Sequence, residues 1–167
     1  MTDYAPETDS DTAELTGEQD PTRIALLRND LRGMTASERG LVVSTLVTRM
    51  GIDPALAPID LIADKRTGAL RVYINARGAA ELAKRHELSD DALSVDIRTE
   101  PAVVIVQVVK VSPDGRQLRD VGAAPYDPNR PAELAKAIKQ ATTSAHRRAT
   151  LRMVGIFLNE PTELPDV

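Results

Sequence analysis

Basic side chains at helical spacing give this sequence its clearest chemical signal. Five of them lie late in the chain: Lys136, Lys139, Arg147, Arg148 and Arg152. The first three are separated by intervals that keep them on one face of an α-helix, and the last two form an adjacent i, i+4 pair. Glu133 is the only acid between residues 131 and 155. We therefore interpret this helix as an anion-binding surface, with an ordinary solvated helix face as the alternative.

Further candidate phosphate contacts surround a predicted hairpin in the middle of the chain: Lys65, Arg66, Arg71, Tyr73 and Arg77. The first two lie in its turn, the next two on the polar side of its second strand, and the last opens a helix. An exposed turn and a solvent-facing strand are the alternatives for the first four. The chain has three Tyr, one Phe and no Trp, so this surface would hold a nucleic-acid backbone rather than stack against many bases.

Residues able to carry covalent or metal chemistry do not form a recognisable site. There is no cysteine, and neither His86 nor His146 has a partner at metal-ligand spacing. The chain also lacks the G-x-S-x-G, P-loop and G-x-G-x-x-G motifs. Four carboxylates could gather around magnesium as in a nuclease, but no lysine stands at nuclease-like spacing from them: Asp60, Asp64, Asp96 and Glu100. We expect no catalytic residue, no metal and no cofactor.

Charge is distributed unevenly along the chain. Residues 1–20 hold seven acids and no base, whereas residues 21–167 hold 21 bases and 18 acids, a net charge of +3. We expect residues 1–20 to be a disordered acidic leader, either a solubilising tail or a polyanion that competes with nucleic acid for the basic surface. No apolar run approaches the ~20 residues needed to cross a bilayer, and the N-terminus does not resemble a signal peptide. These features predict a cytoplasmic protein with no membrane partner.

The hydrophobic pattern predicts one α+β domain over residues 21–167. Helices are expected over 21–31, 36–50, 76–88 and 131–154, and strands over 59–64, 69–75, 93–99, 102–111 and 116–124. Thr35 and Glu38 fit a capping box at the start of the second helix, and Gly51 follows its end. The β-branched run 102–111 is too apolar for an open edge, which favours a central strand. The order α-α-β-β-α-β-β-β-α indicates an antiparallel sheet with helices packed on one face.

Several stretches resemble the single-strand annealing proteins of phage recombination, of the RecT, Red-beta and Erf kind, and the related Rad-type annealing proteins. The likeness is greatest to small phage proteins of this kind and covers roughly residues 50–163. It is carried by 70–74 (LRVYI), 77–82 (RGAAEL), 114–116 (DGR), 121–123 (VGA), 137–151 (AIKQATTSAHRRATL) and Gly155. Arg147 and Arg148 match the family pattern as DNA-facing residues, whereas Ser144 and His146 stand where the family has lysines.

The resemblance implies a phage recombination protein of a bacterial host cell. Such a protein would bind single-stranded DNA and promote annealing of complementary strands without covalent catalysis. It would form a homo-oligomeric ring or filament, with a phage exonuclease or a host replication protein as a further partner. The alternative from another class is a phage accessory module that binds a host protein rather than DNA.

Overall fold

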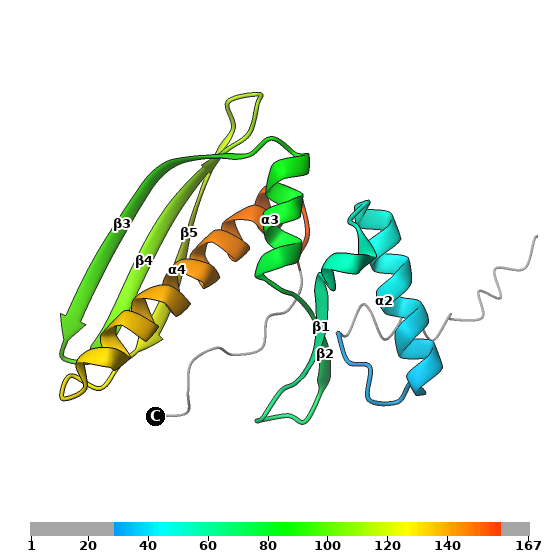
Figure 1. Ribbon diagram of the computed structural model, residues 1–167, viewed down its shortest axis with the longest axis horizontal. Helices are drawn as coiled ribbons and strands as arrows, with labels where there is room; N and C mark the ends of the chain where they lie inside the picture. Colours follow the sequence, from blue (N-terminus) through cyan, green and yellow to red (C-terminus); the bar gives the residue numbers. More distant parts are fainter. Residues whose placement is uncertain (1–28, 158–167) are drawn as a thin grey trace, which may run out of the picture.

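The computed structural model describes residues 29–157 and is an α+β fold, in the predicted order (Figure 1). Its elements are α2 (Ala36–Met50), a short 3-10 helix (Pro54–Leu56), β1 (Ile59–Ala63), β2 (Leu70–Ile74), α3 (Ala76–Arg85), β3 (Ser89–Thr99), β4 (Ala102–Val111), β5 (Gln117–Pro125) and α4 (Pro131–Met153). Strands β1 and β2 form one antiparallel sheet, and β3, β4 and β5 form another with β4 in the centre. The fold class and the central position of β4 are thus confirmed.

Element boundaries follow local signals. The Thr35–Glu38 capping box is present, and Gly51 closes α2 at a φ of 64°. Helix α3 ends three residues before the predicted position 88, because Glu87 adopts a left-handed φ of 51°. Of the predicted helix 21–31, residues 21–28 lie outside the described part, and Asn29 is in a turn with a φ of 47°. Strand β3 begins at Ser89 rather than at 93.

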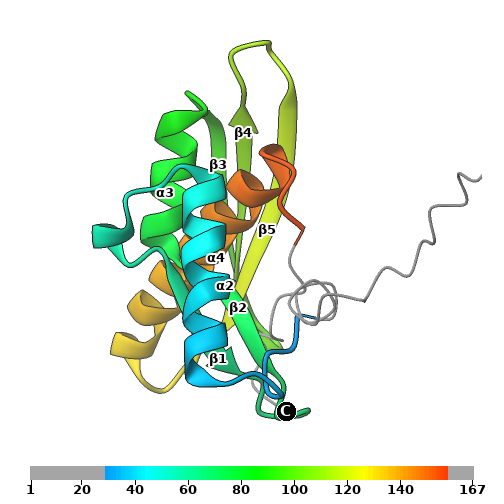
Figure 2. The ribbon, with the colours of Figure 1, turned by 90° about the vertical axis from the view of Figure 1, so that its right-hand side faces the viewer.

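Helix α4 packs closely against β4 and β5 of the three-stranded sheet (Figures 1 and 2). Small residues at helical spacing on α4 meet apolar residues of β4 and β5 in one cluster that includes Ala137, Ala141, Ala145, Ala149, Val104, Val106, Val108 and Ala124. Gly122 of β5 permits this approach, since a Cβ atom there would lie 2.1 Å from the Ala141 carbonyl oxygen. The predicted apolar face of α4 is therefore the face that covers β4 and β5.

A second core joins α2 to the β1–β2 hairpin and to the end of α4. Val42 and Val47 of α2 pack in one cluster with Ile59, Val72 and Leu151. The predicted hairpin turn is confirmed, with Gly68 at a φ of 67°. Helix α3 is capped by Asn75, whose side-chain oxygen accepts hydrogen bonds from the N–H groups of residues 77 and 78 at 3.1 Å. This cap fixes where α3 begins, and α3 packs against α4.

Candidate nucleic-acid interface

Arg147 lies inside the molecule rather than on an exposed helix face. Its side chain is 2% exposed, and its guanidinium carbon lies 4.2 Å from the centroid of the Tyr73 ring. The sheet covers one side of α4, while α3 contacts it from another, so the C-terminal half of the helix has little open surface. Arg147 and Tyr73, predicted as separate DNA contacts, instead touch each other and link α4 to β2 through a cation–π contact.

The other two arginines of this segment attach α4 to the outer strand of the sheet. Arg148 donates a hydrogen bond from Nη1 to the Val121 carbonyl oxygen at 3.2 Å. Arg152 Nη1 lies 3.1 Å from Oδ2 of Asp120, a carboxylate that is only 7% exposed. The other oxygen of that carboxylate accepts a hydrogen bond from the Val121 N–H at 2.8 Å. Arg148 and Arg152 therefore have structural contacts, although the Arg152 side chain remains 55% exposed.

Arg71 is also held by a carboxylate. Its Nη2 lies 3.0 Å from Oδ2 of buried Asp64, and Oδ1 of the same carboxylate accepts from the N–H groups of Arg66 and Thr67. The hydrogen bond from the Thr67 N–H is the largest influence that lowers the pKa of Asp64, against the opposing effect of burial. Asp64 is therefore ionised near neutral pH, and it closes the hairpin turn while neutralising Arg71.

The remaining predicted cations are exposed. Lys65 and Arg66 lie in the hairpin turn, Arg77 lies in the first turn of α3, and Lys136 and Lys139 lie on the N-terminal half of α4. Among them, an ion pair within residues 29–157 is formed by Lys136, whose Nζ is 3.5 Å from a Glu133 oxygen. The other four have no carboxylate partner in the described part of the chain.

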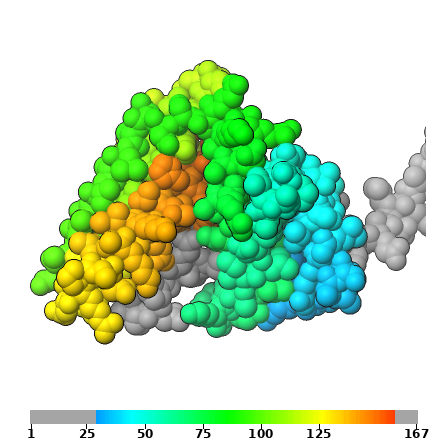
Figure 3. All heavy atoms as spheres, viewed as in Figure 1, coloured from blue at the N-terminus to red at the C-terminus, as the bar shows by residue number. Residues whose placement is uncertain are grey.

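Lys84 joins this group although the sequence reasoning did not select it. It is exposed and lies seven residues after Arg77, two turns along the same side of α3. That spacing was the signal that could have identified it. Helices α3 and α4 pack against each other and both appear on the face of the molecule seen in Figure 3. The exposed cations of these two helices therefore lie on neighbouring elements.

His146 adds little charge to this surface. Its Nδ1 lies 3.5 Å from Oδ1 of Asp90, and the same oxygen is 2.7 Å from the Nζ of Lys110, a residue 5% exposed. Desolvation lowers the pKa of His146, Asp90 acts in the opposite direction, and Lys110 lowers the pKa further. The imidazole is therefore mainly neutral at neutral pH.

The carboxylates considered for magnesium are separated by the fold. Two lie on or beside β1, where Asp60 accepts a hydrogen bond from Asn75 and Asp64 binds Arg71, whereas Asp96 pairs with Arg98 on β3. Within residues 29–157, no three His, Cys, Asp or Glu side chains are grouped so as to hold a metal ion. In the same residues, no helix has the length and apolar character that spanning a membrane requires.

Comparison with known proteins leaves the family open. No protein-family model matches the chain, and no curated protein sequence matches it. The likeness to annealing proteins therefore remains a hypothesis drawn from the sequence motifs.

Proposed function

We propose that this protein binds single-stranded DNA through its phosphates and promotes the annealing of complementary strands. The observation that supports the proposal best is a group of exposed cations on the hairpin turn, α3 and α4 that have no carboxylate partner in the described residues: Lys65, Arg66, Arg77, Lys84 and Lys139. Residues 29–157 hold 19 Lys and Arg against 15 Asp and Glu, a net charge of +4. A polyanion is the ligand class that matches unpaired cations on neighbouring helices.

Annealing places two demands on such a surface. The protein must hold the backbone of a strand, and the base edges must stay available for pairing with a second strand. Phosphate contacts from Lys and Arg meet the first demand, and scarce aromatic side chains meet the second because few bases would be stacked against protein. Tyr73 is covered by Arg147, so it is not part of the proposed contact surface. No covalent step is required.

The test is the salt dependence of binding to a labelled single strand, measured by fluorescence anisotropy. Each phosphate neutralised contributes about −0.7 to the slope of log K against log salt concentration. Replacing Arg77 and Lys139 by Ala should weaken binding at low salt and reduce the slope by about 1.4. The matched control replaces Arg49 and Arg119, two exposed arginines on α2 and β5, and should leave the slope unchanged.

The same experiment decides between the two classes of function. Equal slopes for both double variants would refute this binding surface, and absence of binding at low salt would refute the function. The alternative, a module that binds another protein, would then take its place. That alternative is favoured by the exposed apolar residues Leu93, Val95 and Ile97 on β3. An annealing assay with two complementary strands then tests whether bound DNA is competent to pair.

A further inference from the structure

Strand β3 carries an uncovered apolar row. Leu93, Val95 and Ile97 are 52%, 43% and 47% exposed. They pair with Val108, Val106 and Val104, so they lie on the side of the sheet that faces α4. Helix α4 packs on β5 and β4 and makes few contacts with β3. An 11-residue edge strand therefore presents three large apolar side chains to solvent.

The same residues present their backbone groups to solvent. Hydrogen bonds from Tyr126 N to Ala102 O and from Ser112 N to Arg116 O show that even-numbered residues of β4 bond to β5. Odd-numbered residues of β4 therefore bond to the even-numbered residues of β3 that they oppose. By this alternation the N–H and C=O groups of residues 93, 95 and 97 point outward from the sheet.

Part of the outer edge of β5 and of β2 is hydrogen-bonded to other groups, and within residues 29–157 no such bond reaches the backbone of residues 93, 95 and 97 of β3. On β5, the Val121 N–H and C=O groups are bonded to the side chains of Asp120 and Arg148. On β2, the segment 29–31 bonds to the backbone of Leu70 and Val72 through Asn29, Asp30 and Leu31. Proteins commonly protect strand edges in such ways because an open apolar edge recruits another strand. Within the described residues, the edge of β3 at residues 93, 95 and 97 is therefore able to accept an added strand.

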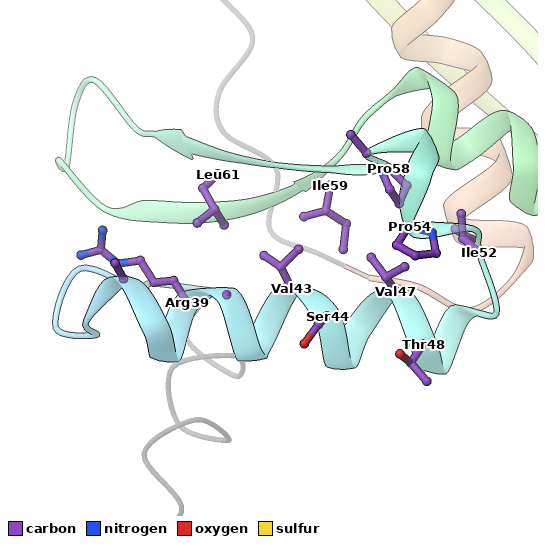
Figure 4. Close-up of a pocket in the computed structure, with 13 residues that line it drawn as sticks. Arg39, Val43, Ser44, Val47, Thr48, Ile52, Pro54, Pro58, Ile59 and Leu61 are labelled. Atoms are coloured by element: carbon purple, nitrogen blue, oxygen red, sulfur yellow. The ribbon is translucent and has the colours of Figure 1, made fainter.

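Among residues 29–157, the outer edge of β1 also has no paired strand, and it borders an apolar groove. Bonds from Asn75 N to Pro58 O and from Asp64 N to Ala69 O direct the backbone groups of Ile59, Leu61 and Ala63 away from β2. Between β1 and α2 lies a groove of about 690 Å³, into which Ile59 and Leu61 point from one side and Val43 and Val47 from the other (Figure 4).

Small side chains leave this groove accessible along α2. Gly40, Ser44 and Thr48 follow one another at four-residue steps on its lining, and all three are exposed. A Cβ atom at Gly40 would meet nothing within 4 Å. The groove therefore has room for the side chains of an added strand.

We propose that β3 of one copy of this chain adds antiparallel to β1 of a second copy, with Leu93, Val95 and Ile97 in the α2–β1 groove. In this arrangement, the residues of β3 whose backbone groups point outward pair with the residues of β1 whose backbone groups point outward. The apolar side chains of both strands then lie on the side of β1 that faces α2. The favoured register sets residues 93, 95 and 97 opposite residues 63, 61 and 59. The interface shares Lys65 with the proposed DNA-binding surface and uses none of its other cations.

Charge pairing favours this register over the registers shifted by two residues. It brings Asp91, which the β-bulge leaves without a partner on β4, opposite Lys65 in the hairpin turn. A shift of two residues in one direction would set Leu93 against Lys65, and a shift in the other would set Asp91 against Ala63. Because the β3 edge of one copy meets the different β1 edge of another, the contact is head-to-tail. A dimer therefore keeps a free β1 edge on one copy and a free β3 edge on the other. Such contacts generate rings or filaments.

Cross-linking tests the contact directly, because the chain has no cysteine of its own. Leu61→Cys and Val95→Cys proteins are treated with a short bismaleimide, separately and as a mixture. The proposal expects a covalent dimer in the mixture and monomers in each separate sample. Val121→Cys, exposed on β5, replaces Val95→Cys in the control mixture and should give no dimer.

Two outcomes would overturn the proposal. Dimers of Val95→Cys alone would indicate symmetric pairing of two β3 strands, and no dimer in the mixture would mean that the two edges do not meet. Sedimentation adds a second measurement. Val95→Lys and the groove-filling Ser44→Trp should each shift oligomers to monomers, whereas Val121→Lys should not. Unchanged melting curves at low protein concentration would show that the variants still fold.

Discussion

Replacing Gly122 by Ala should be one of the most destabilising small changes in the chain. The added Cβ atom would lie 2.1 Å from the Ala141 carbonyl oxygen and 2.6 Å from the Ala145 nitrogen. Ordinary van der Waals contact begins near 3.4 Å, so α4 would have to move by about 1.3 Å from β5 at this point. Both obstacles are backbone atoms of a helix and cannot rotate away as a side chain can.

The displacement of α4 determines how much stability Gly122→Ala is expected to lose. Overpacking in a well-packed core costs about 1–3 kcal/mol, and a radial gap of 0.5–1 Å already forfeits roughly a quarter to a half of a dispersion contact. The whole alanine face of α4 would lose contact with Val104, Val106 and Val108 to some degree. We therefore expect Gly122→Ala to lower the free energy of unfolding by about 3 kcal/mol, a large share of the 5–15 kcal/mol typical of a domain.

Urea denaturation followed by circular dichroism measures this loss. With a slope of about 1–3 kcal/mol/M, the midpoint should fall by roughly 1–3 M. Gly40→Ala is the matched control, because its Cβ atom meets nothing within 4 Å and the residue lies inside α2. The control should gain about 0.5–1 kcal/mol from helix propensity. Stability within 0.5 kcal/mol of wild type for Gly122→Ala would refute the close approach of α4 to β5.

Three further perturbations test other parts of the structure. Arg147→Ala should lower the free energy of unfolding in urea by about 2 kcal/mol through the lost contact with Tyr73 and lost packing, and Arg147→Lys should restore little of it. Thr35→Ala should cost about 1 kcal/mol in the same assay by removing the cap of α2. Hydrogen bonding from the Arg32 side chain lowers the pKa of Asp30 from 3.8 to about 2. The stabilisation from Asp30 is therefore complete above pH 4 and lost as pH falls through 2, and Asp30→Asn should flatten the stability profile over that interval.

Local chemistry made much of the fold predictable from the sequence. The Thr35–Glu38 capping box and Gly51 set the two ends of α2, and each of these signals lies next to the helix end that it specifies. The β-branched run of β4 is too apolar for an open edge, and the structure gives it a neighbouring strand on each edge. These signals depend on residues that are close in sequence, so they can be recognised in a single amino-acid sequence.

Tertiary contacts determined what the sequence pattern could not predict. Arg147 has the spacing of a solvent-facing residue, and it becomes buried because β2, some 70 residues earlier, places Tyr73 beside it. Likewise, the alternation of Leu93, Val95 and Ile97 is typical of a half-buried strand, yet α4 stops short of β3. Helical periodicity identifies which residues share a face, but it does not identify which element covers that face.

Lys65 is part of both proposals, and replacing it distinguishes between them. As a phosphate contact it would lower the salt slope of DNA binding by about 0.7 when replaced. As the partner of Asp91 in a neighbouring copy it would act on assembly instead. Lys65→Glu in the Leu61→Cys protein and Asp91→Lys in the Val95→Cys protein should then each weaken the cross-link between residues 61 and 95. Combining the two charge changes should recover the cross-link. Recovery of cross-linking together with an unchanged slope would assign Lys65 to the subunit contact and leave DNA to the cations of α3 and α4. No recovery, with a reduced slope, would assign it to DNA and remove the charge argument for the register.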